Sequence, residues 1–128
     1  MNREKMKMKV MADTRGEIVN VEIGKKGIYL VHSLPNSHRA GYHFPDAERK
    51  VSIIDGSLTF YFTNPENPEK EEKYEVLTGE NIIIPKGTAY REFNEEEVYF
   101  ASTCILGSGD RKLIYKPYRE IVIGSLKL

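Results

Sequence analysis

The sequence predicts an all-β domain, a sandwich or a barrel, because of three features of its patterning. Short runs rich in Val, Ile, Phe and Tyr recur along its 128 residues. Gly, Pro, Asn and Asp interrupt these runs at short intervals, as they do where strands end in turns. No stretch shows the apolar period of an amphipathic helix. The length suits one domain, with a core that needs neither a disulfide nor a metal to be stable.

The composition excludes several classes of partner. Lys and Arg total 19, as do Asp and Glu, so the formal net charge is zero and no global field attracts nucleic acid. No apolar run approaches the roughly 20 residues that span a bilayer, and the basic residues 1–9 lack the apolar centre of a secretory signal. Cys104 is the one cysteine, which favours a reducing compartment. We therefore expect a cytoplasmic protein without nucleic-acid or membrane partners.

The first half of the chain is expected to form strands divided by turns. Residues 17–23 alternate between apolar and polar side chains, and a Gly-Lys-Lys-Gly turn follows them. Residues 35–41 are expected to form a loop, and Asp55-Gly56 joins two apolar runs as a tight hairpin does. These signals predict strands at Glu17–Ile23, Ile28–Val31, Tyr42–Phe44, Lys50–Ile54 and Ser57–Thr63.

The second half continues the same pattern around one charged excursion. Residues 64–73 are rich in Glu, Lys and Pro, so we expect a solvated loop there. A Pro-Lys-Gly turn closes the run of three isoleucines, and a Gly-Ser-Gly-Asp turn follows the apolar residues 98–106. These signals predict strands at Tyr74–Leu77, Ile82–Ile84, Val98–Leu106, Leu113–Tyr115 and Glu120–Ile123. A further short strand is expected shortly after Gly87.

The N-terminal residues differ from the rest because Lys and Met alternate in residues 5–9. They suit an edge strand, a strand swapped onto a neighbouring subunit, or a frayed tail. Residues 13–16 form a turn between this segment and the next strand. We therefore predict an N-terminal strand or arm over residues 1–16 and a β-barrel domain over residues 17–128.

Residues 79–94 carry the most specific motif, Gly-Glu-Asn-Ile-Ile-Ile-Pro-Lys-Gly-Thr-Ala-Tyr-Arg-Glu-Phe-Asn. Its spacing, G-x5-P-x-G-x2-H-x3-N with Tyr90 in place of the histidine, resembles the second motif of the cupins. Cupins are small jelly-roll barrels, also called double-stranded β-helices, with a ligand or metal site inside. The resemblance covers roughly the middle half of the chain and implies a single-domain cupin-type jelly roll.

The first cupin motif, G-x5-H-x-H-x3-4-E-x6-G, is degenerate in this chain. Its two histidines align with His43 and Pro45 and its acid with Arg49, so only His43 keeps a metal ligand. Glu48 breaks the spacing and would point to the opposite face of its strand. One imidazole does not make the two-His-one-carboxylate set that iron and similar metals need. We therefore expect no metal and no cofactor, with a metal-dependent cupin of atypical ligands as the alternative.

Period-two alternation predicts which side chains enter the barrel. Tyr90 and Glu92 share one face of their strand, and Arg49 shares a face with two inward apolar residues. A buried arginine needs an anionic partner, which is either Glu92 or the carboxylate or phosphate of a ligand. The predicted pocket residues are His43, Tyr90, Arg39, Arg49, Phe60 and Glu92.

Three short segments are similar to cupin nucleotide-sugar ketoisomerases and epimerases. They are Asp13-Thr-Arg-Gly16, the strand at His43, and Tyr115-Lys-Pro-Tyr-Arg-Glu120. Those enzymes act on dTDP-linked 4-keto-6-deoxyhexoses and move protons next to a carbonyl group. The resemblance implies His43 as the catalytic base and Tyr90 as the acid. It also implies that arginines bind the phosphate. Together with the pocket residues above, this gives Arg39, Arg49, Phe60 and Glu92 as the expected substrate-binding residues.

Several alternatives remain open at this point. The chain is either a metal-independent isomerase or epimerase of an anionic, sugar-type ligand or a non-catalytic cupin that binds such a ligand. In the structural alternative, Arg49 pairs with Glu92 in the core and the Tyr90 hydroxyl bonds to the same carboxylate. We also expect a homodimer, with Phe44, Tyr61 and the N-terminal strand as candidates for its surface.

Overall fold

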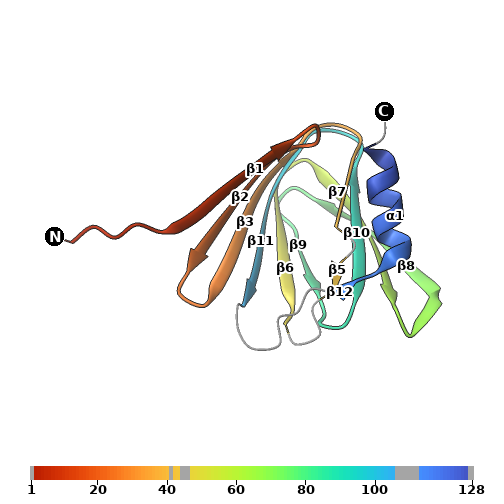
Figure 1. Ribbon diagram of the computed structural model, residues 1–128. Coiled ribbons are helices and arrows are strands. Elements are labelled where there is room, and N and C mark those ends of the chain that lie inside the picture. The colour runs from red at the N-terminus through yellow and green to blue at the C-terminus, as the bar shows by residue number, and fades with distance from the viewer. Residues whose placement is uncertain (1, 41, 44–46, 106–112, 127–128) are drawn as a thin grey trace.

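Two antiparallel sheets face each other in the arrangement of a jelly roll (Figure 1). This computed structural model describes residues 2–40, 42–43, 47–105 and 113–126. The larger sheet has the order β1 (Lys7–Asp13), β2 (Gly16–Ile23), β3 (Lys26–Ser33), β11 (Val98–Ile105), β6 (Arg49–Asp55) and β9 (Asn81–Ile84). The smaller sheet has the order β4 (Ser37–Ala40), β10 (Ala89–Asn94), β7 (Ser57–Asn64) and β8 (Asn67–Leu77). A short pair joins β5 (Tyr42–His43) to β12 (Leu113–Ile114), and one helix, α1 (Lys116–Ser125), follows it.

Strands that are distant in sequence lie side by side, which is why the chain closes into a jelly roll. β3 pairs with β11, and β6 lies between β11 and β9. Along β7, the side chains of Leu58, Phe60 and Phe62 all point into the core, and Phe60 is completely buried. The predicted fold class and the predicted inward face of this strand are therefore confirmed.

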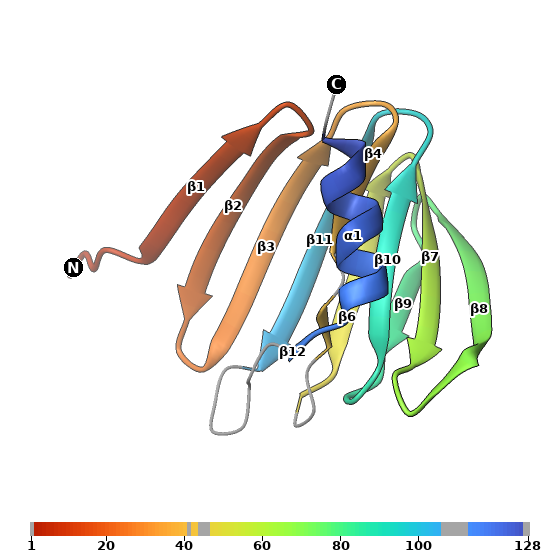
Figure 2. The same ribbon diagram turned by 45° about the vertical axis from the view of Figure 1, so that its right-hand side comes forward.

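The hairpin of β1 and β2 extends the larger sheet past the smaller one (Figures 1 and 2). β1 pairs with β2 from Lys7 to Asp13, so the N-terminal segment is an edge strand of its own chain. Gly16 ends the turn with φ of 121°, and a Cβ there would lie 2.1 Å from the carbonyl oxygen of His32. Only glycine allows this approach. The Asp13 carboxylate accepts a hydrogen bond from the backbone N–H of Arg15 at 2.8 Å and so fixes the turn.

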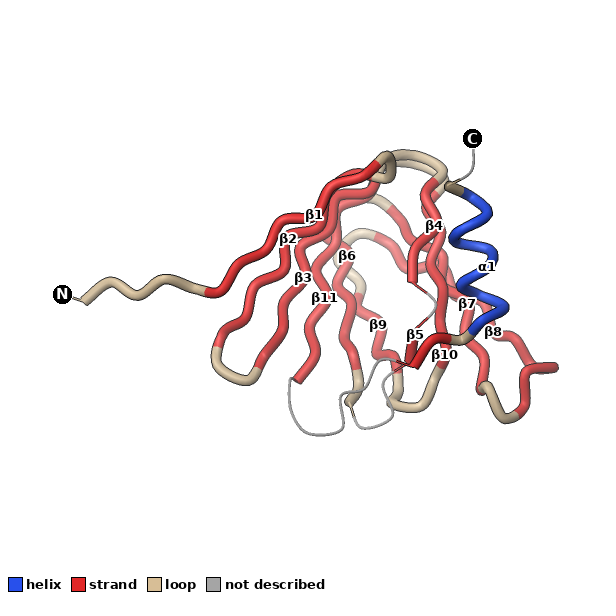
Figure 3. Tube along the Cα trace, viewed as in Figure 1, coloured by secondary structure: helices blue, strands red, loops and turns tan. Residues whose placement is uncertain are grey.

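The strand predicted at Glu120–Ile123 is wrong, because this segment lies within helix α1 (Figure 3). The expectation that no helix would form is wrong for the same reason. Pro117 stands in the first turn, where its missing N–H leaves no hydrogen bond unmade. Tyr118 and Val122, one turn apart, are the buried residues of the helix. Two buried positions are too few to show a helical period, and the β-branched run Ile-Val-Ile is typical of a strand.

Two predicted loops are also wrong. β8 runs through most of the charged stretch 64–73 as the edge strand of the smaller sheet, with Val76 as its buried residue. Charged side chains on such an edge discourage pairing with another chain. The same charged composition is typical of a solvated loop, so it led to the wrong prediction. β4 occupies most of the loop predicted at residues 35–41, after a turn in which Asn36 adopts φ of 61°.

Arg91 joins the helix to the outer face of the smaller sheet. Its guanidinium lies 3.7 Å from the centre of the Tyr61 ring and 5.4 Å from that of Tyr118. The Tyr118 hydroxyl donates a hydrogen bond to Glu71 at 2.7 Å. Arg91 therefore stacks on Tyr61, a predicted dimer-surface residue, while Phe44 lies outside the described residues. Within the described residues, no helix has the length and apolarity of a membrane span.

The outward face of β1, β2 and β3 is apolar and largely uncovered. Met8 and Val10 on β1 are 62% and 57% exposed, and Leu30 on β3 is 45% exposed. Val10 lies opposite Val19, which in turn lies opposite Leu30, so these side chains form one row across the sheet. A row of this kind is typical of a surface that another protein covers.

The homodimer predicted from the sequence stays a prediction, and this face is where we place it. Val10→Lys should give a monomer, because it would bury an unpaired charge in the interface. Sedimentation velocity of the wild type and the variant measures the change. Thr14→Lys adds the same charge in the exposed β1–β2 turn and should leave the dimer intact. A wild-type chain that sediments as a monomer contradicts the prediction.

Candidate functional site

A cavity of about 310 Å³ lies between the inner faces of the two sheets, on the side of the β1–β2 hairpin. Its apolar wall comes from the larger sheet, where Val31, Val51 and Phe100 are buried. Its polar lining comes from both sheets, the hairpin and α1. The ionisable groups of this lining are Arg15, Arg39, Arg49, Arg119, Tyr90, Tyr29 and Glu92. The cavity therefore combines an apolar wall with four arginines and one carboxylate.

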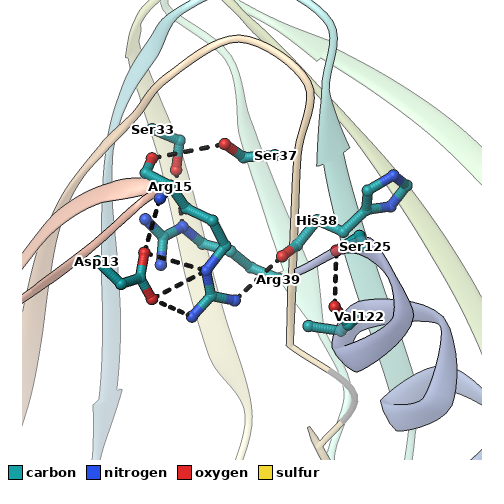
Figure 4. Close-up of polar contacts among 8 residues, drawn as sticks. All are labelled: Asp13, Arg15, Ser33, Ser37, His38, Arg39, Val122 and Ser125. Atoms are coloured by element: carbon teal, nitrogen blue, oxygen red, sulfur yellow. Dashed lines mark hydrogen bonds and ion pairs between the residues drawn. The ribbon is translucent and has the colours of Figure 1, made fainter. Parts of the chain in front are cut away.

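Arg39 lies on β4 and reaches across to the larger sheet (Figure 4). Its Nε donates a hydrogen bond to the hydroxyl of Ser33 at 2.8 Å. The side chain is buried, yet its Nη2 has no hydrogen-bond partner in the parts of the chain that the structure describes. Burial, followed by the repulsion of Arg15, lowers the pKa of Arg39 from its ordinary value. The guanidinium is thus a fixed cation that lacks a full counter-charge.

Arg15 adds a second cation beside Arg39 (Figure 4). Its Nε and Nη2 donate to Oδ2 of Asp13 at 3.0 Å and 2.6 Å, Nε also donates to Oδ1 at 3.2 Å, and Nη1 donates to the carbonyl oxygen of His38 at 3.1 Å. The hydrogen bonds from Arg15 hold the pKa of the Asp13 carboxyl below its ordinary value, although burial opposes them. We call Arg39 and Arg15, next to Ser33, the Arg39 pole.

Arg49 forms a second pole at the other end of the cavity. Its Nη1 donates to the hydroxyl of Ser102 at 3.1 Å, and its guanidinium lies 5.0 Å from the centre of the Tyr29 ring. Ser33 pairs with Val98 on β11, and Ser102 lies four residues further along that strand. At about 3.3 Å per residue, the serines that hold the two poles are roughly 13 Å apart along the sheet.

Tyr90 and Glu92 point into the cavity from β10, on the same face of the strand. They are only 5% and 7% exposed. Glu92 lies directly opposite Arg39 in the strand register, yet it makes no ion pair or hydrogen bond with any residue that the structure describes. The Tyr90 hydroxyl likewise has no hydrogen-bond partner among those residues. Both polar groups therefore face the cavity without a bond to any residue that the structure describes.

Burial controls the proton affinity of both groups. It raises the pKa of Glu92 to about 7, although the charges of Arg39, Arg49 and Arg15 pull the other way. It also raises the pKa of Tyr90 to about 12, against the opposing charge of Arg49. At neutral pH, Tyr90 is therefore a neutral donor, whereas Glu92 exchanges its proton readily.

The predicted pocket residues fall into three groups according to their position relative to the cavity. Arg39, Arg49, Tyr90 and Glu92 meet in the cavity. Phe60 lies behind this wall in the core, 6.4 Å from the Tyr90 ring between centres, and does not line the cavity. The side chain of His43 lies outside the described residues, and the structure shows only its backbone, paired with Leu113.

The structural alternatives drawn from the sequence do not occur. No ion pair joins Arg49 to Glu92, and the Tyr90 hydroxyl does not bond to that carboxylate. The sequence reasoning also missed Arg15, Arg119 and Tyr29 as lining residues. Arg15 follows a turn and Arg119 lies on the unpredicted helix, so strand alternation gave no signal for either.

The donor set does not fit a metal ion. Among the described residues, no three His, Cys, Asp or Glu side chains come together as a metal-binding group. Arg49 and Tyr90 occupy two positions at which metal-binding cupins place ligands, and both line the cavity here. A guanidinium repels a cation and cannot coordinate one. We therefore derive no chemistry from a metal at these positions.

A larger hollow of about 540 Å³ lies beside β7, β8 and β9, and several of its polar side chains are bonded within its lining. The Tyr74 hydroxyl donates to Glu72 at 2.7 Å, and the Thr63 hydroxyl donates to the carbonyl oxygen of Lys70 at 3.1 Å. It lacks the unsatisfied buried groups that distinguish the arginine-lined cavity.

Comparison with known proteins supports the fold. No protein-family model and no curated protein matches the chain. CapF, the capsular polysaccharide assembling protein of Staphylococcus aureus, superposes with a TM-score of 0.72 at 14% identity, over 84% of this chain and 34% of its own. Vicilin from Corylus avellana gives 0.68 at 19% identity, over 85% and 34%. A recombinant oxalate oxidase in complex with glycolate gives 0.59 at 18% identity, over 70% and 46%.

The two sheets and the cavity between them define a jelly-roll barrel with an arginine-lined interior. This fold is the cupin-like jelly roll that the resemblance of the motifs implied. The chain spans about a third of the length of the first two solved proteins and less than half of the third. At these identities the likeness shows the fold alone.

Glu92→Gln should stabilise the protein at pH 8 and not at pH 4. The folded carboxyl keeps its proton up to about pH 7, whereas the unfolded one releases it near its ordinary value of 4.5. The free energy of unfolding of the wild type therefore falls as the pH rises between these values. Glutamine removes this loss, which reaches on the order of 3 kcal/mol. Urea unfolding at the two pH values measures it.

Glu75→Gln, at an exposed position on β8, is the control for this prediction. It should give the same difference from the wild type at both pH values. Equal stability of Glu92→Gln and the wild type at pH 8 would show that Glu92 does not carry a destabilising buried charge.

Proposed function

We propose that the chain binds a small anionic organic molecule of the sugar-phosphate or dicarboxylate type in the arginine-lined cavity, without a metal. The observation that carries this proposal is the lining itself, in which four arginines face one carboxylate that pairs with none of them. Guanidinium groups bind carboxylates and phosphates through paired hydrogen bonds. An anion would supply the counter-charge that the buried Arg39 Nη2 lacks.

The size and polarity of the cavity narrow the ligand class. At about 310 Å³ it lies at the lower end of ligand sites, which run from roughly 300 to 1,000 Å³. A sugar phosphate or a dicarboxylate suits this volume, and the nucleotide of a nucleotide sugar would extend outside. The Arg39 and Arg49 poles favour a ligand with an anionic group at one end or both. Ser102, Tyr90 and Glu92 offer hydrogen bonds to its hydroxyl or carbonyl groups.

The first test measures binding of fructose 6-phosphate and of 2-oxoglutarate by calorimetry. Arg39→Gln and Arg49→Gln should each weaken binding by about tenfold or more, because a hydrogen bond to a charged group contributes about 1.5–3 kcal/mol. Arg3→Gln removes an exposed arginine before β1 and should leave the affinity unchanged. Neutral fructose should bind far more weakly than its phosphate. Equal binding of the two sugars contradicts the proposal.

Anion binding should tighten as the pH falls from 8 to 6. Glu92, with its pKa raised to about 7, loses its charge over this range, and its repulsion of an incoming anion disappears. Calorimetry with 2-oxoglutarate measures the change, since the carboxylates of this ligand stay ionised throughout. In Glu92→Gln the affinity should be the same at pH 6 and pH 8. A wild-type affinity that is independent of pH contradicts the role of Glu92.

The sequence resemblance extends the proposal to an isomerase or epimerase of a nucleotide-linked keto sugar, with His43 as base and Tyr90 as acid. Tyr90 lies in the cavity as that mechanism needs. His43→Ala tests the role of His43 as the base, because removal of a general base lowers turnover by roughly 100-fold or more. A non-catalytic binding protein would lose affinity alone.

A further inference from the structure

We propose that the cavity catalyses proton transfer at a carbon next to a carbonyl group, with Glu92 as the base and Tyr90 as the donor to the enolate oxygen. This inference rests on the anion binding proposed above, which places the substrate. It assigns the base to a residue other than His43. The substrate class is a carbonyl compound with a carboxylate or a phosphate.

Glu92 and Tyr90 lie two residues apart on β10 and point to the same side of the strand. Both line the cavity, and both are more than nine-tenths buried. Neither is bonded to another residue in the described parts of the chain. A carboxyl group that serves only the core would be satisfied by the core, and Arg39 stands directly opposite in the register without pairing to it. Glu92 is therefore available to a bound molecule.

The other ionisable groups of the cavity do not compete for this role. Arg15, Arg39, Arg49 and Arg119 stay cationic. Burial raises the pKa of Tyr90 to about 12, so this phenol stays protonated near neutral pH. Asp13, next to the cavity, accepts hydrogen bonds from Arg15 through both oxygens. Among the described lining residues, Glu92 is thus the group that changes its protonation state near neutral pH.

The step balances without an oxidant or a reductant. The anionic group of the substrate binds at an arginine pole. The Glu92 carboxylate takes the proton from the carbon next to the carbonyl, the C–H electron pair forms a C=C bond, and the carbonyl oxygen becomes an enolate. The Tyr90 hydroxyl donates a hydrogen bond to that oxygen, and the nearby Arg49 charge stabilises it further. Return of the proton to the same carbon regenerates the starting compound. For isomerisation of a sugar, Tyr90 gives its proton to the enolate oxygen and takes one from the neighbouring hydroxyl, so that this hydroxyl becomes the new carbonyl group while Glu92 returns its proton to the other carbon.

Deuterium exchange followed by proton NMR tests the inference directly. Fructose 6-phosphate and 2-oxoglutarate each carry hydrogens next to a carbonyl group. With the wild type in D₂O, exchange in at least one of them should exceed the buffer rate by about 100-fold. Glu92→Gln should abolish this excess and still bind the compound by calorimetry. Tyr90→Phe should slow exchange by about 10-fold to 100-fold and weaken binding by about 10-fold at most, because the ligand loses one neutral hydrogen bond.

The outcomes separate the two proposals. Binding of a probe without exchange above the buffer rate overturns proton transfer and leaves the proposed function standing. Failure of both probes to bind overturns the proposed function and this inference with it. Exchange that persists in Glu92→Gln and is lost in His43→Ala overturns the assignment of the base. The exchange is measured at pH 8, where Glu92→Gln is expected to be more stable than the wild type, so misfolding does not confound the result.

Discussion

The structure depends on the burial of positive charge between two sheets. A guanidinium inside a protein costs several kcal/mol unless hydrogen bonds and counter-charges replace its water. Here neutral hydroxyls perform part of this task, since Ser33 holds Arg39 and Ser102 holds Arg49. A hydroxyl orients a cation but does not neutralise it. The fold therefore fixes the positions of both cations at the cavity wall.

The two motifs that resemble those of metal-binding cupins bear on how a jelly roll of this kind acquires such a lining. In both motifs the ligand positions point inward because of strand alternation, whatever residue occupies them. Arg49 and Tyr90 occupy two of those positions and line the cavity. At these positions a guanidinium and a phenol replace metal ligands. The positions then attract an anion instead of a metal cation. The same backbone that would hold a metal ion is then suited to hold an anion.

The sequence was sufficient wherever two-residue periodicity decides the outcome. It predicted the β fold, the inward face of β7, and the meeting of Arg39, Arg49, Tyr90 and Glu92. It failed where tertiary context decides. The charged β8 is a strand because its partner β7 holds one edge, and α1 is a helix although its β-branched residues favour a strand. Phe60 has the correct inward direction, but its place behind Tyr90 depends on depth, which alternation does not give.

The lining residues that the sequence did not predict come from different elements than the predicted ones. The motif strands supply Arg49, Tyr90 and Glu92, which form the far end and middle of the cavity. Arg15 and Arg119 come from the β1–β2 turn and from α1, elements that lie outside both motifs. Turns change more freely than paired strands because fewer backbone hydrogen bonds constrain them. Under the proposed function, the motif strands supply the reacting groups and Arg49, whereas the hairpin and the helix add the further cations that meet the anion.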